Sequence, residues 1–369
     1  MVNIDYHLIL FSYWVLFWRK FLWNPYLLCT SEIASTFFPH WRWIGRQLRQ
    51  GIFPSQDDIY YKLPGSIPFL ATFYPPNLIS AWLGSFLKED HAFRLYAYFI
   101  IIHFLLCSFF AYELFGNLFG AITLAYAGYV IKPNTPTFVF SATWVPLALK
   151  GSAVGWAMAL WGGYYPILVY IIPVVAFLQP ISCILGSLLA SAQLLPFIGY
   201  FKRSVRMTEK VDQNFGRVPW WKLSDLINPI RNIGTTNGVH YPEVMMYMGI
   251  APLLIFHPSI FYIPLILSIL VVVGLIPPFQ RISARALYLL TLSFCLVALP
   301  FDSIYLFLIQ AFLLLQNASI YPSFPFNQWW NKPSKLYSQK PKSYNWPFVT
   351  GYREGFKISD YVGAFRLSN

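Results

Sequence analysis

Long uncharged runs dominate the pattern of hydrophobic and polar positions in this chain. Residues 151–201 and residues 244–280 contain no Asp, Glu, Lys or Arg. A helix that crosses a membrane needs about 20 predominantly apolar residues, so each run is long enough for at least two spans. The apolar residues are continuous rather than alternating, which indicates helices rather than a membrane barrel. The sequence therefore predicts an all-α, polytopic membrane protein.

Changes in polarity divide the chain into six parts. These are a first span (1–24), a polar loop (25–92), a helical bundle (93–200), a second polar loop (201–243), C-terminal spans (244–320) and a basic, aromatic tail (321–369). By length, helices are expected over 6–24, Asn77–Leu87, Leu95–Tyr112, Leu118–Ile131, Phe138–Leu149, 286–300 and 303–319, with breaks at Gly162-Gly163 and Gln179-Pro180.

The first polar loop contains a segment with the periodicity of an amphipathic helix. Arg42, Arg46 and Arg49 fall together on one face of it, and Pro39 must lie in its first turn or kink it. A helix of this kind is suited to lie in the membrane interface. The apolar positions that recur at helical spacing are Ile33, Phe37, Trp41, Ile44 and Leu48.

Composition supports the prediction of a membrane protein and argues against some classes of function. The chain is 57% hydrophobic and only 11% charged, whereas soluble domains carry about 25% charged residues. The net charge of +12 is explained by contact with membrane lipids that have anionic headgroups and by the topology bias of Lys and Arg. No nucleic-acid-binding motif, disulfide framework or Walker loop is present, so neither nucleic-acid binding nor ATP-driven transport is predicted.

Two acidic sites in the first loop are candidates for chemistry. Glu32 follows the first span and could act as general base on a hydroxyl acceptor, or it could be a helix N-terminal acid that interacts with the macrodipole. Asp57 and Asp58 could bind a divalent cation, Mg²⁺ or Mn²⁺, or they could be solvated loop residues. The sequence indicates no other cofactor than this candidate cation.

Basic residues in both polar loops are candidates for holding a lipid phosphate. Guanidinium groups form forked, charge-assisted bonds to phosphate, but they also anchor a helix to headgroups in general. In the second loop, topology is a third interpretation of the same charges. The candidate phosphate-binding residues are Arg42, Arg46, Arg203, Arg206 and His40.

The side of the membrane on which the second loop lies is left open by the sequence. If both polar loops face the same side, an even number of spans must separate them. Three spans within residues 151–201, with 138–149 also spanning, satisfy this condition. Two spans within the same stretch place the second loop in the cytoplasm, which its basic residues favour.

The order of short motifs resembles one known family. The chain is similar to the bacterial YfhO family of membrane proteins, which belongs with the GT-C type glycosyltransferases that use polyprenyl-phosphate sugars. The likeness runs in order from about Glu32 to Ile255. Its motifs are FFP (37–39), LRQGIFP (48–54), LPGSIPFLATFYPPNLI (63–79), IIHFLL (101–106), LAYAGYV (124–130), WVPLAL (144–149), LLASAQLLPFIGYFKRSVR (188–206) and YMGIAPLLI (247–255).

This resemblance implies a GT-C fold, with interface helices in a first extracytoplasmic loop and an acid after span one that activates the acceptor. By position that acid is Glu32, where the family pattern usually has Asp. The resemblance also implies a polyprenyl-phosphate-linked sugar donor, a multi-pass location in the bacterial inner membrane and no nucleic-acid partner. Two alternatives stay open: a carrier or flippase for a lipid-linked substrate, for which His103 is the mid-span candidate, and a non-catalytic scaffold reduced from a glycosyltransferase.

Overall fold

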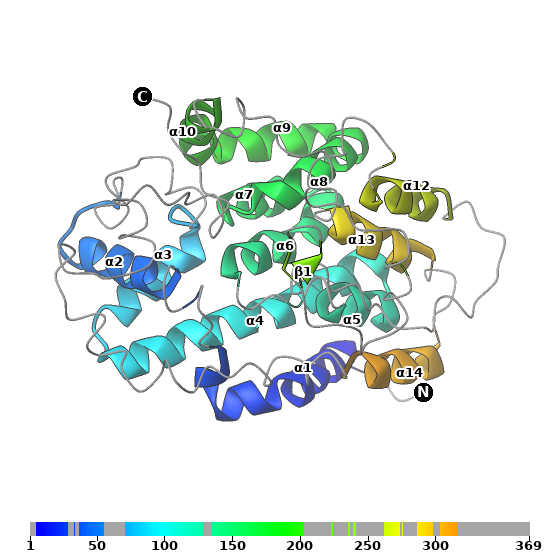
Figure 1. The fold of residues 1–369 in the computed structure, drawn as a ribbon, viewed down its shortest axis with the longest axis horizontal. Helices are drawn as coiled ribbons and strands as arrows, with labels where there is room; N and C mark the ends of the chain where they lie inside the picture. The colour runs from blue at the N-terminus through cyan, green and yellow to red at the C-terminus, as the bar shows by residue number, and fades with distance from the viewer. Residues whose placement is uncertain are drawn as a thin grey trace.

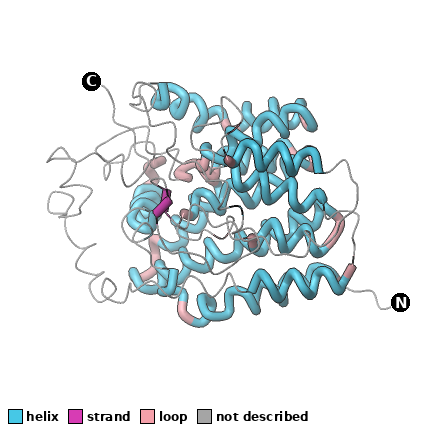
Figure 2. The backbone as a smooth tube through the Cα atoms, turned by 45° about the vertical axis from the view of Figure 1, so that its right-hand side comes forward, coloured by secondary structure: helices cyan, strands magenta, loops and turns pink. Residues whose placement is uncertain are grey.

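The structure is a bundle of helices. The computed structural model describes residues 5–28, 33, 37–54, 71–127, 131, 135–202, 223, 235–236, 239–240, 262–273, 275, 286–297 and 303–315. In this part of the chain the structure is helical, apart from one antiparallel pair of two-residue strands, β1 (Thr235–Thr236) and β2 (Val239–His240). Figures 1 and 2 show the helices stacked side by side. The predicted all-α fold class is confirmed.

Helix α4 (Glu89–Phe115) is the central element of the bundle. It packs against α1 (Tyr6–Trp23), α3 (Pro75–Gly84), α5 (Leu118–Tyr126) and α6 (Pro136–Leu149). At about 1.5 Å per residue its length is about 40 Å. One side of the helix is buried in the core, while other residues along it are exposed. The other helices are arranged around this axis (Figure 1).

The remaining helices pack in pairs around these five. Helix α7 lies between α6 and α9, α13 and α14 contact α5, α12 contacts α13, and α2 contacts α3. Their bounds are η1 Pro25–Leu28, α2 Phe38–Arg49, α7 Ala153–Trp161, α8 Tyr165–Leu178, α9 Pro180–Leu189, α10 Ser191–Lys202, α12 Tyr262–Val272, α13 Leu287–Val297 and α14 Ile304–Leu315.

Most predicted boundaries agree with the structure to within a few residues. Helices lie where they are expected for 6–24, for the amphipathic segment and for Phe138–Leu149. The breaks at Gly162-Gly163 and Gln179-Pro180 are also found. One expectation was wrong: helix α5 ends at Tyr126 rather than near Ile131. The structure also has a bend that was not predicted, of 81° at Ala190 between α9 and α10.

Prolines define several helix starts. Helices α2, α3, α6, α8 and α9 each have Pro at the first or second helical position. The missing amide donor costs nothing there, because the first amides of a helix have no intrahelical acceptor, and the fixed φ favours the helix. The prediction that Pro39 lies in the first turn of its helix is confirmed.

Two glycines allow α2 and α3 to approach closely. A Cβ atom at Gly45 would lie 2.2 Å from the Ala81 carbonyl oxygen, and one at Gly84 would lie 2.0 Å from the Trp41 ring. The Trp41 Nε1 atom also donates to the Ser80 hydroxyl at 3.0 Å. The amphipathic helix is therefore held against α3 by close packing and one buried hydrogen bond.

Charged residues on α4 are confined to its two ends. The stretch Leu95–Tyr112 contains no Asp, Glu, Lys or Arg and is about 27 Å long. Of the described helices, α4 alone is long and apolar enough to cross a membrane, and α9 with α10 would be a second if the bent pair forms one span. The core helix of a soluble protein can have the same length and composition, so the membrane location belongs to the proposed function.

The close contact between α2 and α3 predicts the effect of adding one methyl group. Gly45→Ala should lower the free energy of unfolding by roughly 1–3 kcal/mol, because the new Cβ atom meets a backbone carbonyl that cannot rotate away. The measurement is thermal unfolding followed by circular dichroism. Val154→Ile, which adds one methyl group to an exposed side chain on α7, is the control and should change stability by less than about 0.5 kcal/mol. Equal unfolding midpoints for both variants would show that the close approach is not required.

Candidate functional site

The end of the bundle where α4 begins brings most of the described sequence candidates together. Helices α2 and α3 lie beside the first turns of α4, and η1 follows α1 at the same end (Figure 1). Five basic residues occur on α2 and around the first two turns of α4, together with two acidic residues. They are Arg42, Arg46, Arg49, Lys88 and Arg94, and the acidic pair is Glu89 and Asp90.

Two of the three α2 arginines bind the C-terminal end of α3. Arg42 Nη1 donates to the Gly84 carbonyl oxygen at 2.6 Å and to the Leu87 carbonyl oxygen at 3.4 Å. Arg49 Nη1 donates to the Ser85 carbonyl oxygen at 3.4 Å. These carbonyls lie at the negative end of the α3 dipole, and the Gly84 carbonyl also accepts from the Leu87 amide at 3.1 Å, so the arginines cap the last turn of the helix.

Arg46 is the α2 arginine without a bond to the rest of the bundle. It is exposed, as Arg49 is, but among the described residues no hydrogen bond or ion pair reaches it. Burial, together with the charge of Arg46, lowers the pKa of Arg42, and the carboxylate of Glu89 opposes this shift. Arg42 stays protonated, as arginine does in proteins, so both guanidinium groups are positive. A phosphate at this end would find the donors of Arg46 accessible and those of Arg42 partly used.

His40 lies inside the bundle rather than on its surface. Its side chain is buried, its Nε2 atom is 2.9 Å from the Thr72 hydroxyl oxygen, and its ring stacks on Trp43. The neighbouring Ala71 has a positive φ of 54°, which is uncommon for a residue other than glycine. The contact therefore fixes the chain where it enters α3.

A second buried network fixes the same segment from the other side. The Trp144 Nε1 atom donates to the Tyr74 hydroxyl at 2.6 Å, and that hydroxyl lies 2.8 Å from His103 Nε2. His103 Nδ1 is 2.6 Å from the Phe99 carbonyl oxygen. Because a carbonyl can only accept, Nδ1 carries the proton and Nε2 accepts from Tyr74. The start of α3 is thereby tied to α4 and α6.

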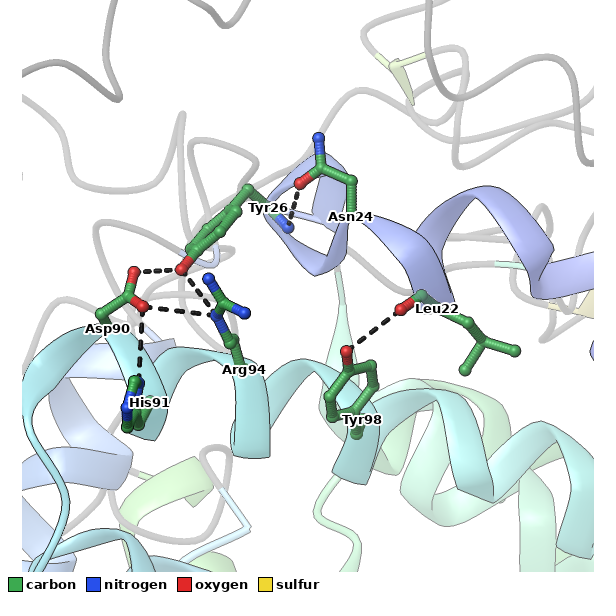
Figure 3. Close-up of polar contacts among 7 residues, drawn as sticks. All are labelled: Leu22, Asn24, Tyr26, Asp90, His91, Arg94 and Tyr98. Carbon is green, nitrogen blue, oxygen red and sulfur yellow. Dashed lines mark hydrogen bonds and ion pairs between the residues drawn. The ribbon is translucent and has the colours of Figure 1, made fainter.

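A polar cluster joins η1 to α4, and it was not predicted from the sequence. The Tyr26 hydroxyl donates to Asp90 and accepts from Arg94 Nε at 2.9 Å, and Asp90 is also paired with Arg94 at 3.3 Å and with His91 at 3.5 Å (Figure 3). Next to it, the Tyr98 hydroxyl donates to the Leu22 carbonyl oxygen at 3.1 Å. The connection that leaves α1 is therefore fastened to α4.

Only part of the predicted site can be placed. The structure brings Arg42, Arg46 and His40 to one helix, with the two arginines near the surface and the histidine buried. Ile33 follows Glu32 directly in the chain and is fully buried. The other candidates, Glu32, Asp57, Asp58, Arg203 and Arg206, lie outside the described residues.

The described ranges contain no group of three or more His, Cys, Asp or Glu side chains that could hold a metal ion. The cation expected at Asp57 and Asp58 stays a prediction, because both residues lie outside those ranges. Comparison with known proteins adds no relative: no family model, no curated protein and no solved structure matches the chain. The likeness to YfhO proteins therefore rests on the residues of this chain alone.

The different environments of Arg42 and Arg46 predict different effects on stability. Arg42→Gln should lower the free energy of unfolding by about 1–2 kcal/mol, because it removes charged donors from the last carbonyls of α3. Arg46→Gln, the matched control one turn along the same helix, should change it by less than about 0.5 kcal/mol. Thermal unfolding of the two variants checks the difference. A larger loss for Arg46→Gln would contradict the assigned roles.

The buried hydroxyl of Tyr74 provides a second test. Tyr74→Phe removes one oxygen but leaves Trp144 Nε1 and His103 Nε2 buried without their partner, which should cost about 1–3 kcal/mol. Tyr98→Phe removes an exposed hydroxyl that bonds one carbonyl, and we expect a loss below about 1 kcal/mol. Thermal unfolding of both variants compares the stability that each hydroxyl contributes. Equal losses of unfolding free energy would mean that burial of the network does not increase its contribution to stability.

Proposed function

We propose that the protein is a multi-pass membrane glycosyltransferase of the GT-C type. It transfers a sugar from a polyprenyl-phosphate donor to a hydroxyl of an extracytoplasmic acceptor in the bacterial cell envelope. The observation that carries the proposal is the position of α2. This basic, tryptophan-rich helix is packed across one end of an apolar bundle, and it follows Glu32 closely in the chain. A lipid phosphate at the membrane surface would meet this helix.

Exposed apolar surface supports the membrane location. In α9 only Gly186 is buried, while large apolar side chains face outward. On α14 the ring of Phe312 is 70% exposed. Soluble monomers rarely expose contiguous apolar surface on this scale, whereas lipid tails would cover it. Further exposed apolar residues occur at Phe177, Ile181, Leu185, Leu188, Ile266 and Leu308.

The polar ends of α4 support the same location. Glu113 and Lys150 pair at 2.6 Å near the end of α4, and Asp90 pairs with Arg94 near its start. The uncharged stretch between the two ends is about 27 Å long, close to the hydrocarbon thickness of about 30 Å. Charges placed in this way would lie at the two interfaces.

The proposed reaction is a direct displacement with inversion. Glu32 takes the proton of the acceptor hydroxyl, and the hydroxyl oxygen attacks the anomeric carbon of the sugar. The bond from that carbon to the donor phosphate oxygen breaks, and the phosphate leaves with the electron pair. The positive charge of Arg46 stabilises the leaving phosphate as its charge develops. Arg42 keeps α2 in place on α3.

The proposal is tested by assaying the purified protein with synthetic polyprenyl-phosphate hexoses and following release of the polyprenyl phosphate. Glu32→Gln should lower the rate about 10²–10⁴-fold, because it removes the general base. Arg46→Gln should lower kcat/KM about 10–100-fold, because it removes a charged donor from the leaving phosphate. Glu113→Gln is the control. It removes an exposed carboxylate at the opposite end of α4, so the rate should not change.

Unchanged activity in Glu32→Gln would remove that residue as the base. If the unmodified protein releases no polyprenyl phosphate from any hexose donor, the proposal that it is a transferase is wrong.

A further inference from the structure

An open apolar groove of about 560 Å³ lies between α1, α3 and α4. Its polar lining atoms are already bonded within the bundle. The Ser80 hydroxyl donates to the Asn77 carbonyl oxygen at 3.1 Å, and the hydroxyl of Tyr98 is held by Leu22. Such a groove offers hydrocarbon contacts and little hydrogen bonding. Its walls include Trp14 and Leu22 of α1, Ile79 and Leu83 of α3, and Leu95 and Ile102 of α4.

One end of this groove lies beside the polar cluster of Tyr26, Asp90 and Arg94. Along α4, Tyr98 lines the groove and Arg94 precedes it by one helical turn, so both side chains lie on the same side of the helix (Figure 3). Arg94 makes its hydrogen bond to Tyr26 and its ion pair with Asp90 through the Nε atom. Its two Nη groups therefore remain as a forked donor for a phosphate.

The apolar walls of the groove indicate a hydrocarbon occupant. From Leu95 to Ile102 the groove extends about 10 Å along α4. An extended hydrocarbon chain can lie along walls of this length. The basic excess at this end of the bundle, five positive against two negative side chains, favours an anionic head.

We propose that the groove binds one acyl chain of an anionic phospholipid, whose phosphate is held by the Nη groups of Arg94. The bound lipid fills the gap between α1 and α3 and links the first helix to the basic end of the bundle. This inference rests on the membrane location within the proposed function, but it does not depend on transfer of a sugar.

The test places a photo-crosslinking residue, p-benzoylphenylalanine, in the full chain in vesicles of phosphatidylglycerol and phosphatidylcholine. Ile79 reports on the groove. Ile266 on α12, which is similarly exposed and apolar, is the control. At Ile79 the crosslinked lipid should be enriched in phosphatidylglycerol by about fivefold over the vesicle composition, and at Ile266 it should match that composition. Arg94→Gln should abolish the enrichment at Ile79, while Lys150→Gln, at the opposite end of α4, should leave it unchanged.

Equal lipid ratios at Ile79 and Ile266 would overturn the proposal, since the groove would then hold only general membrane lipid. Loss of the phosphatidylglycerol crosslink when polyprenyl phosphate is added before irradiation would also overturn it, because the groove would then belong to the sugar donor. If no lipid is crosslinked at either position and alkaline carbonate releases the protein from vesicles, the membrane location itself fails. Glu32→Gln separates this inference from the transferase, because it should lose transfer and keep the enrichment.

Discussion

The uncharged stretch Leu95–Tyr112 of α4 is the constraint on which the arrangement of the bundle depends. This stretch is about 27 Å long and contains no Asp, Glu, Lys or Arg. Because an unpaired charge is costly in apolar surroundings, the ionised groups of α4 lie at its two ends. At one end a single pair, Glu113 and Lys150, joins α4 to the residue after α6. At the other end α2, α3 and η1 gather with most of the described basic residues. Among the described residues on and beside α4, ionised side chains are therefore confined to the two ends, and the end where α4 begins has more of them.

The basic residues at this end have two different roles, which can be told apart by the contacts that each side chain makes. Arg42 and Arg49 bind the last carbonyls of α3, so their charge offsets the helix dipole and holds α2 in place. Arg46 lies between them in the sequence but faces solvent, and Arg94 keeps its Nη groups available while its Nε atom is fastened to Tyr26 and Asp90. The two accessible guanidinium groups thus sit on helices that are fixed by other contacts. A fixed support lowers the entropy lost when a phosphate binds.

Local signals in the sequence predicted the elements, while contacts between distant residues could not be predicted. The length of the first apolar run predicted α1, helical periodicity predicted α2, and Gly162-Gly163 and Gln179-Pro180 predicted the breaks before α8 and α9. Tyr26 and Asp90 are 64 positions apart, and nothing near either residue signals their pairing. The bend at Ala190 likewise has no glycine or proline at that position. Beyond the bend, the buried amide of Gln193 donates to the Leu160 carbonyl oxygen at 3.1 Å and to the Tyr165 hydroxyl at 2.8 Å, and these bonds tie α10 to α7 and α8. A buried polar group needs hydrogen-bond partners, and Gln193 finds them on segments about 30 residues away in the sequence.

His103 shows why the type of a residue in a helix does not decide its role. An ionisable side chain in the middle of an apolar helix is a candidate for a transport pathway, and it is the residue on which a carrier would depend. In the structure its ring is buried, its Nδ1–H group donates a hydrogen bond to the Phe99 carbonyl oxygen, and its Nε2 atom accepts one from the Tyr74 hydroxyl. A group bonded at both nitrogens has no lone pair or proton left for a passing substrate. Its bonds instead hold the start of α3 against α4, and α3 supports the basic helix. These contacts give His103 a structural role, so the carrier alternative loses its mid-span candidate.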